Sequence, residues 1–112
     1  MTDRELLELA AKAAEVKGFR YVNNEPIQGG YRTGLWSDLY EDCWNPLTDD
    51  GDALRLAVKL GLFIQINTAS ATAWKWRGEN WFEQASDYAD DMDSTTRRAI
   101  TRAAAEIGRT TT

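Results

Sequence analysis

The sequence predicts an α+β fold, an alpha-beta sandwich in which helices pack on a small antiparallel sheet. Apolar residues repeat at helical spacing in three separate segments, which predicts three helices. The second of these patterns stops at Gly61, and a short run rich in β-branched residues follows at once. A second strand-like run lies only a short turn further on, which favours an antiparallel hairpin. The predicted order is helix, strand, loop, helix, strand, strand, helix.

The first helix is predicted over residues 2–17. Thr2 and Glu5 have the spacing of a capping box, and Gly18 can supply the left-handed residue that stops a helix. Residues 19–22 alternate large rings with other side chains, so they are predicted to form the first strand.

Residues 23–43 form the least regular part of the sequence, since asparagine, proline and glycine interrupt them repeatedly. They leave room for one short strand or turn around residues 31–39. This predicted loop also carries rings and an arginine: Tyr31, Arg32, Trp36 and Tyr40. Two interpretations stay open, a ligand-binding loop or a lid in which Trp36 and Leu39 fold back on the core.

The second helix is predicted over residues 50–60. Three acids lie at its start: Asp49, Asp50 and Asp52. Carboxylates there can accept hydrogen bonds from free backbone N–H groups and oppose the helix dipole. A divalent-cation site is the alternative, but Asp-Asp-Gly-Asp lacks the alternate-residue spacing of a calcium loop, so capping is favoured. Trp44 and Leu47 are placed to pack back on this helix.

The predicted hairpin consists of residues 62–66 and 73–77. Leu62, Ile64 and Ile66 share one face, which is predicted to meet the helices. On the returning strand, two indoles alternate with two cations: Trp74, Lys75, Trp76 and Arg77. Such a strand can stack a flat ligand and hold a phosphate, or the indoles can simply cover the sheet's core face.

The C-terminal third is predicted to begin with a further strand within residues 78–82. Residues 83–93 are acidic and are predicted to form a solvated loop. The third helix is predicted to open at Ser94 and to end at Gly108. Its arginines are expected to pair with acids, or alternatively to form an anion-binding row: Arg97, Arg98, Arg102 and Arg109.

Composition narrows the class of protein. With 112 residues the chain is predicted to be one domain, residues 1–109, with a disordered tail at 110–112. A net charge of −5 argues against long nucleic acids, and histidine is absent, which excludes imidazole chemistry. The single cysteine, Cys43, fits a reducing compartment. No apolar run suggests a signal peptide or a membrane span, so a cytoplasmic protein is expected.

Two stretches resemble a known family. Residues 44–60 read Trp-Asn-Pro-Leu-Thr-Asp-Asp-Gly-Asp-Ala-Leu-Arg-Leu-Ala-Val-Lys-Leu, and residues 96–108 form an alanine- and arginine-rich helix. Together with residues 6–14, they are similar to the phage ABA sandwich domain, a family of small bacteriophage and prophage proteins. The resemblance implies an alpha-beta sandwich encoded by a phage and acting in the host cell, and it carries over no catalytic residue.

The function expected from the sequence is binding without catalysis, with no metal or cofactor. No glycine-rich phosphate loop or nucleophile elbow is present. The first hypothesis is a phage accessory or counter-defence protein that sequesters a small anionic, nucleotide-like ligand. Its expected contacts are Tyr31, Arg32, Trp36, Trp74, Lys75, Trp76 and Arg77. The alternatives are an acidic inhibitor of a host protein, using Asp38, Glu41, Asp42 and residues 87–93, and a homo-oligomeric structural accessory.

Overall fold

The structure is a computed structural model that describes residues 2–37, 42–67, 70–77, 80–87 and 92–110. For residues 76, 77 and 80–87 it describes the backbone alone. The helices are α1 (Asp3–Ala13), α2 (Asp50–Leu60) and α3 (Met92–Thr110). The strands are β1 (Arg20–Ile27), β2 (Gly30–Ser37), β3 (Asp42–Trp44), β4 (Phe63–Ile66), β5 (Ser70–Arg77) and β6 (Asn80–Asp87). The α+β class predicted from the sequence is therefore confirmed.

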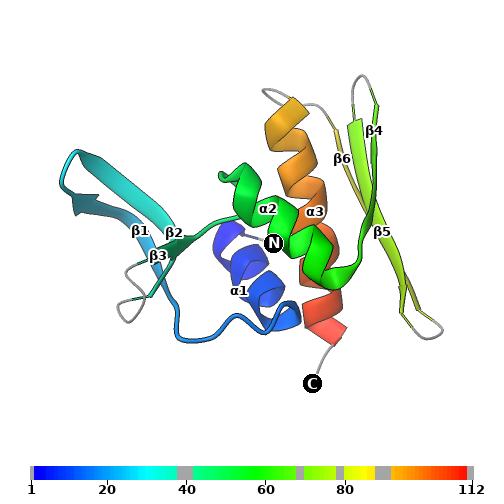
Figure 1. The fold of residues 1–112 in the computed structure, drawn as a ribbon, viewed down its shortest axis with the longest axis horizontal. Coiled ribbons are helices and arrows are strands. Elements are labelled where there is room, and N and C mark those ends of the chain that lie inside the picture. The colour runs from blue at the N-terminus through cyan, green and yellow to red at the C-terminus, as the bar shows by residue number, and fades with distance from the viewer. Residues whose placement is uncertain (1, 38–41, 68–69, 78–79, 88–91, 111–112) are drawn as a thin grey trace.

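The strands form two separate sheets, with the helices between them (Figure 1). Sheet A has the strand order β1-β2-β3, sheet B has the order β4-β5-β6, and all neighbouring strands are antiparallel. Helix α3 is central, because it contacts α1, α2 and the strands β5 and β6. The chain thus builds a sheet on each side of its helices, where the sequence predicted helices packed on one sheet.

The prediction of a loop over residues 23–43 is wrong, since sheet A occupies most of this segment. The register between β1 and β2 shifts between Val22 and Glu25, where Asn24 has a positive φ of 51°. Gly29, with φ of 90°, lies in the turn that joins the two strands. Asparagine and glycine therefore mark a bulge and a hairpin turn here, and the sequence pattern alone did not distinguish these from a loop.

Most of the capping residues predicted for the first two helices are confirmed. Thr2 caps α1: its hydroxyl accepts from the backbone N–H of Glu5 at 3.1 Å. Helix α1 nevertheless ends at Ala13, before the predicted end, and Glu15 rather than Gly18 takes the first positive φ, 58°. Helix α2 has the predicted bounds, with Gly61 as its left-handed C-cap.

Small residues allow α3 to sit at the centre of the molecule. Four alanines of this helix have no exposed surface: Ala99, Ala103, Ala104 and Ala105. Gly108 was predicted to end the helix, but α3 continues to Thr110. A Cβ atom on Gly108 would lie 1.9 Å from the carbonyl oxygen of Leu9. Gly108 is therefore required for the close approach of α1 and α3, and not for a helix stop.

Sheet B contains the predicted hairpin, with β4 paired to β5. Ile64 packs against the core opposite Ala73, as predicted, whereas Ile66 is 60% exposed. The predicted acidic loop over residues 83–93 is partly wrong, because residues up to Asp87 belong to β6 and Met92 already opens α3. The remaining residues, 88–91, lie outside the described ones. In the described part of the chain, none of the helices combines the length and apolar character that crossing a bilayer demands.

Candidate ligand-binding cleft

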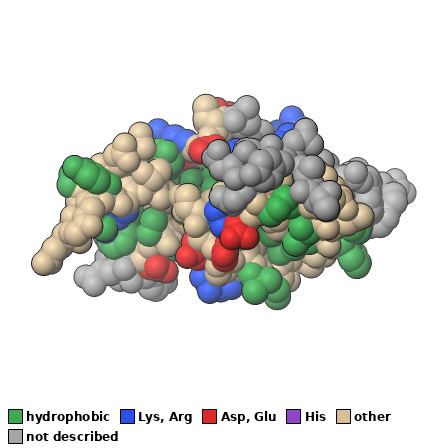
Figure 2. Space-filling model, turned by 90° about the horizontal axis from the view of Figure 1, so that it is seen from above, with side chains coloured by type: hydrophobic (Ala, Val, Ile, Leu, Met, Phe, Trp, Pro, Cys, Tyr) green, Lys and Arg blue, Asp and Glu red, His purple; other side chains and the backbone are tan. Residues whose placement is uncertain are grey.

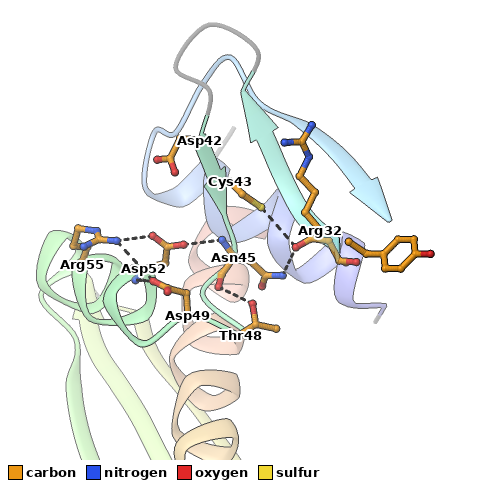
Figure 3. A pocket seen from close by; sticks show the side chains of 10 residues that line it. Arg32, Asp42, Cys43, Asn45, Thr48, Asp49, Asp52 and Arg55 are labelled. Atoms are coloured by element: carbon orange, nitrogen blue, oxygen red, sulfur yellow. Dashed lines mark hydrogen bonds and ion pairs between the residues drawn. The ribbon is translucent and has the colours of Figure 1, made fainter. Parts of the chain in front are cut away.

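A polar cleft lies where β2 and β3 meet the start of α2 (Figure 3). We call it the β3–α2 cleft. Its volume is about 450 Å³, within the range of small-molecule sites. Its lining residues are Tyr31, Arg32, Thr33, Asp42, Cys43, Asn45, Thr48, Asp49, Asp52 and Arg55.

Asn45 and Asp52 hold the walls of this cleft together. The buried Asp52 carboxylate accepts from the backbone N–H of Asn45 at 2.9 Å. The Asn45 amide donates to the carbonyl of Thr33 at 2.9 Å, and its oxygen accepts from the N–H of Leu47 at 3.0 Å. Two side chains thus connect β2, the segment after β3 and α2, as Figure 3 shows. Because these hydrogen bonds fix the cleft walls relative to one another, the cleft is preorganised for binding.

Gly34 permits the same junction to close. Its φ is 138°, and a Cβ there would lie 2.9 Å from the Cβ of Asn45 and 3.0 Å from the carbonyl oxygen of Trp44. Only glycine combines that backbone conformation with that approach. Strand β2 is therefore held against the Asn45 segment by backbone proximity as well as by hydrogen bonds.

The first turn of α2 contributes charged groups to the cleft. Asp49 is the N-cap, and its carboxylate accepts from the N–H of Asp52 at 2.8 Å, which confirms the predicted capping role. The Arg55 guanidinium donates to Asp52 at 2.7 Å and lies 3.9 Å from Asp49. The hydrogen bond that Arg55 donates to Asp52 raises the pKa of Arg55, so this exposed side chain stays charged. No described group of three or more cysteine, aspartate or glutamate residues is arranged to hold a metal ion.

Arg32 and Tyr31 form the opposite wall. The Arg32 side chain extends away from the Asp52 network, as Figure 3 shows. It makes two 3.3 Å hydrogen bonds to Glu25 and lies 3.4 Å above the centre of the Trp36 ring. The Tyr31 ring is 71% exposed, and the Asp42 carboxylate is also exposed. Tyr31 and Asp42 are therefore accessible to a ligand, whereas Arg32 is held by the protein.

Cys43 is a half-buried thiol in this cleft. Its Sγ lies 3.7 Å from the carbonyl oxygen of Thr33, to which it donates a weak hydrogen bond. Burial raises the pKa of Cys43, and the nearby carboxylates of Asp52 and Asp42 raise it further, against a smaller opposing effect from Arg32. The thiol is thus kept protonated and is a poor nucleophile.

The structure separates the site residues predicted from the sequence. Tyr31 and Arg32 line the cleft, and Trp36 lies beneath Arg32. The others belong to β5 in sheet B, on the other side of the helices (Figure 1). There Trp74 stacks on Phe63 with ring centres 5.8 Å apart, and Lys75 donates to the carbonyl of Leu60 at the end of α2. The side chains of Trp76 and Arg77 lie outside the described part of the structure.

Other predicted surfaces can be placed only in part. Of the proposed acidic patch, Asp42 and Asp93 are described with their side chains, and both are exposed. The other side chains named for it lie outside the described residues. Three of the four arginines of α3 pair with acids, as one interpretation predicted: Arg97 with Asp50, Arg98 with Asp3 and Arg109 with Glu106.

Sequence reasoning missed the residues that build the cleft. From the sequence, Asn45 stands out only as part of the Trp-Asn-Pro run, and Asp52 only as a capping acid. One sequence pattern could have indicated these residues. It is an asparagine just before a proline, seven residues upstream of an aspartate in the first turn of a helix. The partner of the Asn45 amide, the Thr33 carbonyl, lies on another strand and leaves no sequence mark.

Comparisons with known proteins return no match: no family, no curated protein and no solved structure is significantly similar to this chain. The cleft is therefore interpreted from its own chemistry.

Proposed function

We propose that this protein binds and sequesters a small nucleotide-like ligand in the β3–α2 cleft, without transforming it. The observation that carries the proposal is the composition of one cleft of about 450 Å³. An exposed ring, Tyr31, and an exposed guanidinium, Arg55, lie in it together with the exposed carboxylate of Asp42. A ring can stack on a base, a carboxylate can accept from the N–H groups of a base edge, and a guanidinium can bind phosphate.

The charge of the cleft narrows the class of ligand. Two arginines and three aspartates line it, so its formal charge is −1. Arg32 is already paired with Glu25, and Arg55 with Asp52. A ligand that brings several negative charges close together is therefore disfavoured by repulsion. We expect nucleosides and cyclic nucleotides, which carry at most one negative charge per phosphate, to bind better than triphosphates.

The same residues favour binding over catalysis. The Cys43 thiol has a raised pKa, and the chain has no histidine that could activate it. Asp52 is occupied by Asn45 and Arg55, and Asp49 by the helix N-terminus. These carboxylates position the cleft walls and are not available as an acid–base pair. The resemblance described above supports a phage origin, and a counter-defence role is the function we propose for a phage protein that sequesters such a ligand.

Calorimetric titration tests the proposal. The panel contains a nucleoside, a cyclic mononucleotide, a cyclic dinucleotide and a nucleoside triphosphate. For the best ligand, Tyr31→Ser is expected to weaken binding by about tenfold or more, because a stacking contact is lost. Arg55→Gln is expected to weaken the binding of phosphate-containing ligands more than the binding of the nucleoside. Phe63→Ser is the matched control, since Phe63 is a similarly exposed ring on sheet B.

The expected pattern is heat for at least one panel member, reduced by both cleft variants and unchanged in the control. Absence of heat for every panel member at millimolar concentration, together with no ligand retained on purification, would overturn the proposal. So would binding that both cleft variants leave intact, because the ligand would then lie elsewhere.

A further inference from the structure

Exposed hydrophobic side chains concentrate on α2 and β4. Among the described residues, four of the six large hydrophobic side chains that are exposed belong to these two elements: Leu54, Val58, Phe63 and Ile66. Seen from above, hydrophobic side chains reach the surface on both sides of a central group of acidic and basic ones (Figure 2). Scattered apolar residues need no explanation, but a concentration on adjacent elements marks an interaction surface.

Three of these residues belong to one groove or extend it. A depression of about 380 Å³ lies between α2, α3 and β4, and Leu54, Ile64, Ile66 and Ile100 line it. Ile64 and Ile66 share the face of β4 that looks toward the helices, since they pair with the buried Ala73 and Ala71. Val58 lies one turn after Leu54 on α2 and continues the apolar surface.

The groove borders a sheet edge that has no charged residue. Strand β4 is an edge of sheet B and reads Phe63-Ile-Gln-Ile66. The backbone N–H of Asn67 donates to the carbonyl of Ser70 at 2.8 Å. By the alternation of an antiparallel ladder, Phe63 and Gln65 also point their backbone groups toward β5, and Ile64 and Ile66 point theirs toward the open edge. This edge carries none of the charges that usually discourage strand addition.

We propose that a second copy of this chain docks here, with β4 pairing antiparallel to β4 of the partner about a twofold axis at Gln65. This register places Ile64 opposite Ile66 of the partner subunit. Both residues direct N–H and C=O groups outward, so the two chains can exchange backbone hydrogen bonds. The result is one continuous six-stranded sheet with an isologous interface.

Charge on α2 favours a second copy as the occupant. The helix starts with Asp50, whose side chain is exposed, and has Lys59 in its last turn. A twofold axis perpendicular to the sheet reverses the direction of α2 in the plane of the sheet, so the Asp50 end of each helix is directed toward the Lys59 end of the other, with Leu54 and Val58 between. The two copies carry −5 each, yet the strands at the seam contribute no charge, so repulsion there is small.

Sedimentation velocity over a concentration series tests the dimer. The wild-type chain is expected to dimerise, and Ile66→Lys or Leu54→Lys is expected to raise the dissociation constant at least about tenfold, because each lysine brings an unpaired charge into the apolar seam. Both residues are exposed, so circular dichroism is expected to show an unchanged fold. Ile27→Lys is the matched control, because Ile27 is an exposed isoleucine on β1, an edge strand of sheet A.

A cross-link tests the register. In a Cys43→Ser background, Gln65→Cys places two thiols opposite each other at a pair with a Cα separation of about 4.5 Å, which a disulfide can span. Phe63→Cys does not face itself in this register and is expected to stay monomeric on a non-reducing gel. A wild-type chain that is monomeric up to about 1 mM, a dimer that both lysine variants leave intact, or a Gln65→Cys variant that fails to cross-link would overturn the proposal.

Discussion

The two sheets are attached to the helices by different kinds of interaction. Sheet A is joined to α2 through hydrogen bonds centred on Asn45 and Asp52. Beside these bonds lies an apolar cluster with fewer buried residues than the core around α3: Leu7, Ala11, Leu35 and Leu47, with partly buried side chains packed against them. Sheet B presses the buried Ala71 and Ala73 against the alanine-rich core around α3. The difference teaches that sheet A depends on a few directional polar groups, whereas the α3 side depends on the small size of its residues.

Gly108→Ala tests the dependence of the α3 core on small residues. Of the substitutions considered, it is expected to lower the stability most. The added methyl group meets the carbonyl of Leu9, which is backbone and cannot move without displacing α1. We expect a loss of about 3 kcal/mol or more in the free energy of unfolding, measured by urea denaturation.

The matched control for this change is Gly51→Ala in α2. There the added methyl group lies 3.2 Å from the flexible end of Arg55 and from the Asp49 carboxylate. Since alanine favours helix, stability is expected to stay the same or to rise by up to about 1 kcal/mol. Equal stability of Gly108→Ala and the wild type would contradict the close approach of α1 and α3.

Asp52→Ala tests the hydrogen bonds that join sheet A to α2. It leaves the buried N–H of Asn45 without an acceptor, so we expect a loss of about 2 kcal/mol in unfolding free energy. Because Asn45 connects the strands to α2, hydrogen exchange is expected to accelerate in β2 and β3 more than in β5.

Asp50→Ala is the control in the same helical turn. Its carboxylate is exposed and pairs with Arg97, so a loss of at most about 1 kcal/mol is expected. If Asp52→Ala loosened both sheets equally, the two attachments would not be independent and the comparison between them would fail.

Lys75→Met tests a polar contact on the sheet B side. Lys75 on β5 donates to the carbonyl of Leu60 and so satisfies an acceptor at the C-terminal end of α2. We expect a loss of about 1 kcal/mol in a thermal or urea melt. Lys59→Met, at an exposed position in the same turn of α2, is expected to change stability less, and the reverse order would argue against this cap.

The pH dependence conferred by Cys43 is the smallest expected effect. Because the folded pKa of the thiol is raised, the unfolded chain loses this proton first as the pH rises. The contribution to stability is therefore complete below the ordinary thiol pKa and declines as the pH rises through about 9 toward the folded pKa. Cys43→Ser removes this decline, which urea melts at pH 7 and pH 10 measure as a difference from the wild type. An identical pH dependence of both proteins would contradict the burial of the thiol.

Much of the fold followed from local sequence, but the candidate site did not. The bounds of α2 and the presence of the β4–β5 hairpin were predicted from spacing and from glycine, although β5 begins at Ser70 and not at the predicted residue 73. The two predicted indole and cation groups, around Trp36 and around Trp74, were expected to act together, yet they lie on separate sheets. The sequence shows which strands carry aromatic residues but not which sheet each strand joins, because strand pairing depends on residues that are distant in sequence.

The chain by itself determined the features that a few neighbouring residues control. Thr2 and Asp49 cap helices, and Gly61 ends α2, because each acts on backbone groups within a few positions. Only the tertiary structure decided that Gly108 serves the contact with Leu9, and that Asn45 reaches Thr33. Those roles depend on segments that are distant in sequence and become neighbours only when the helices and sheets have packed.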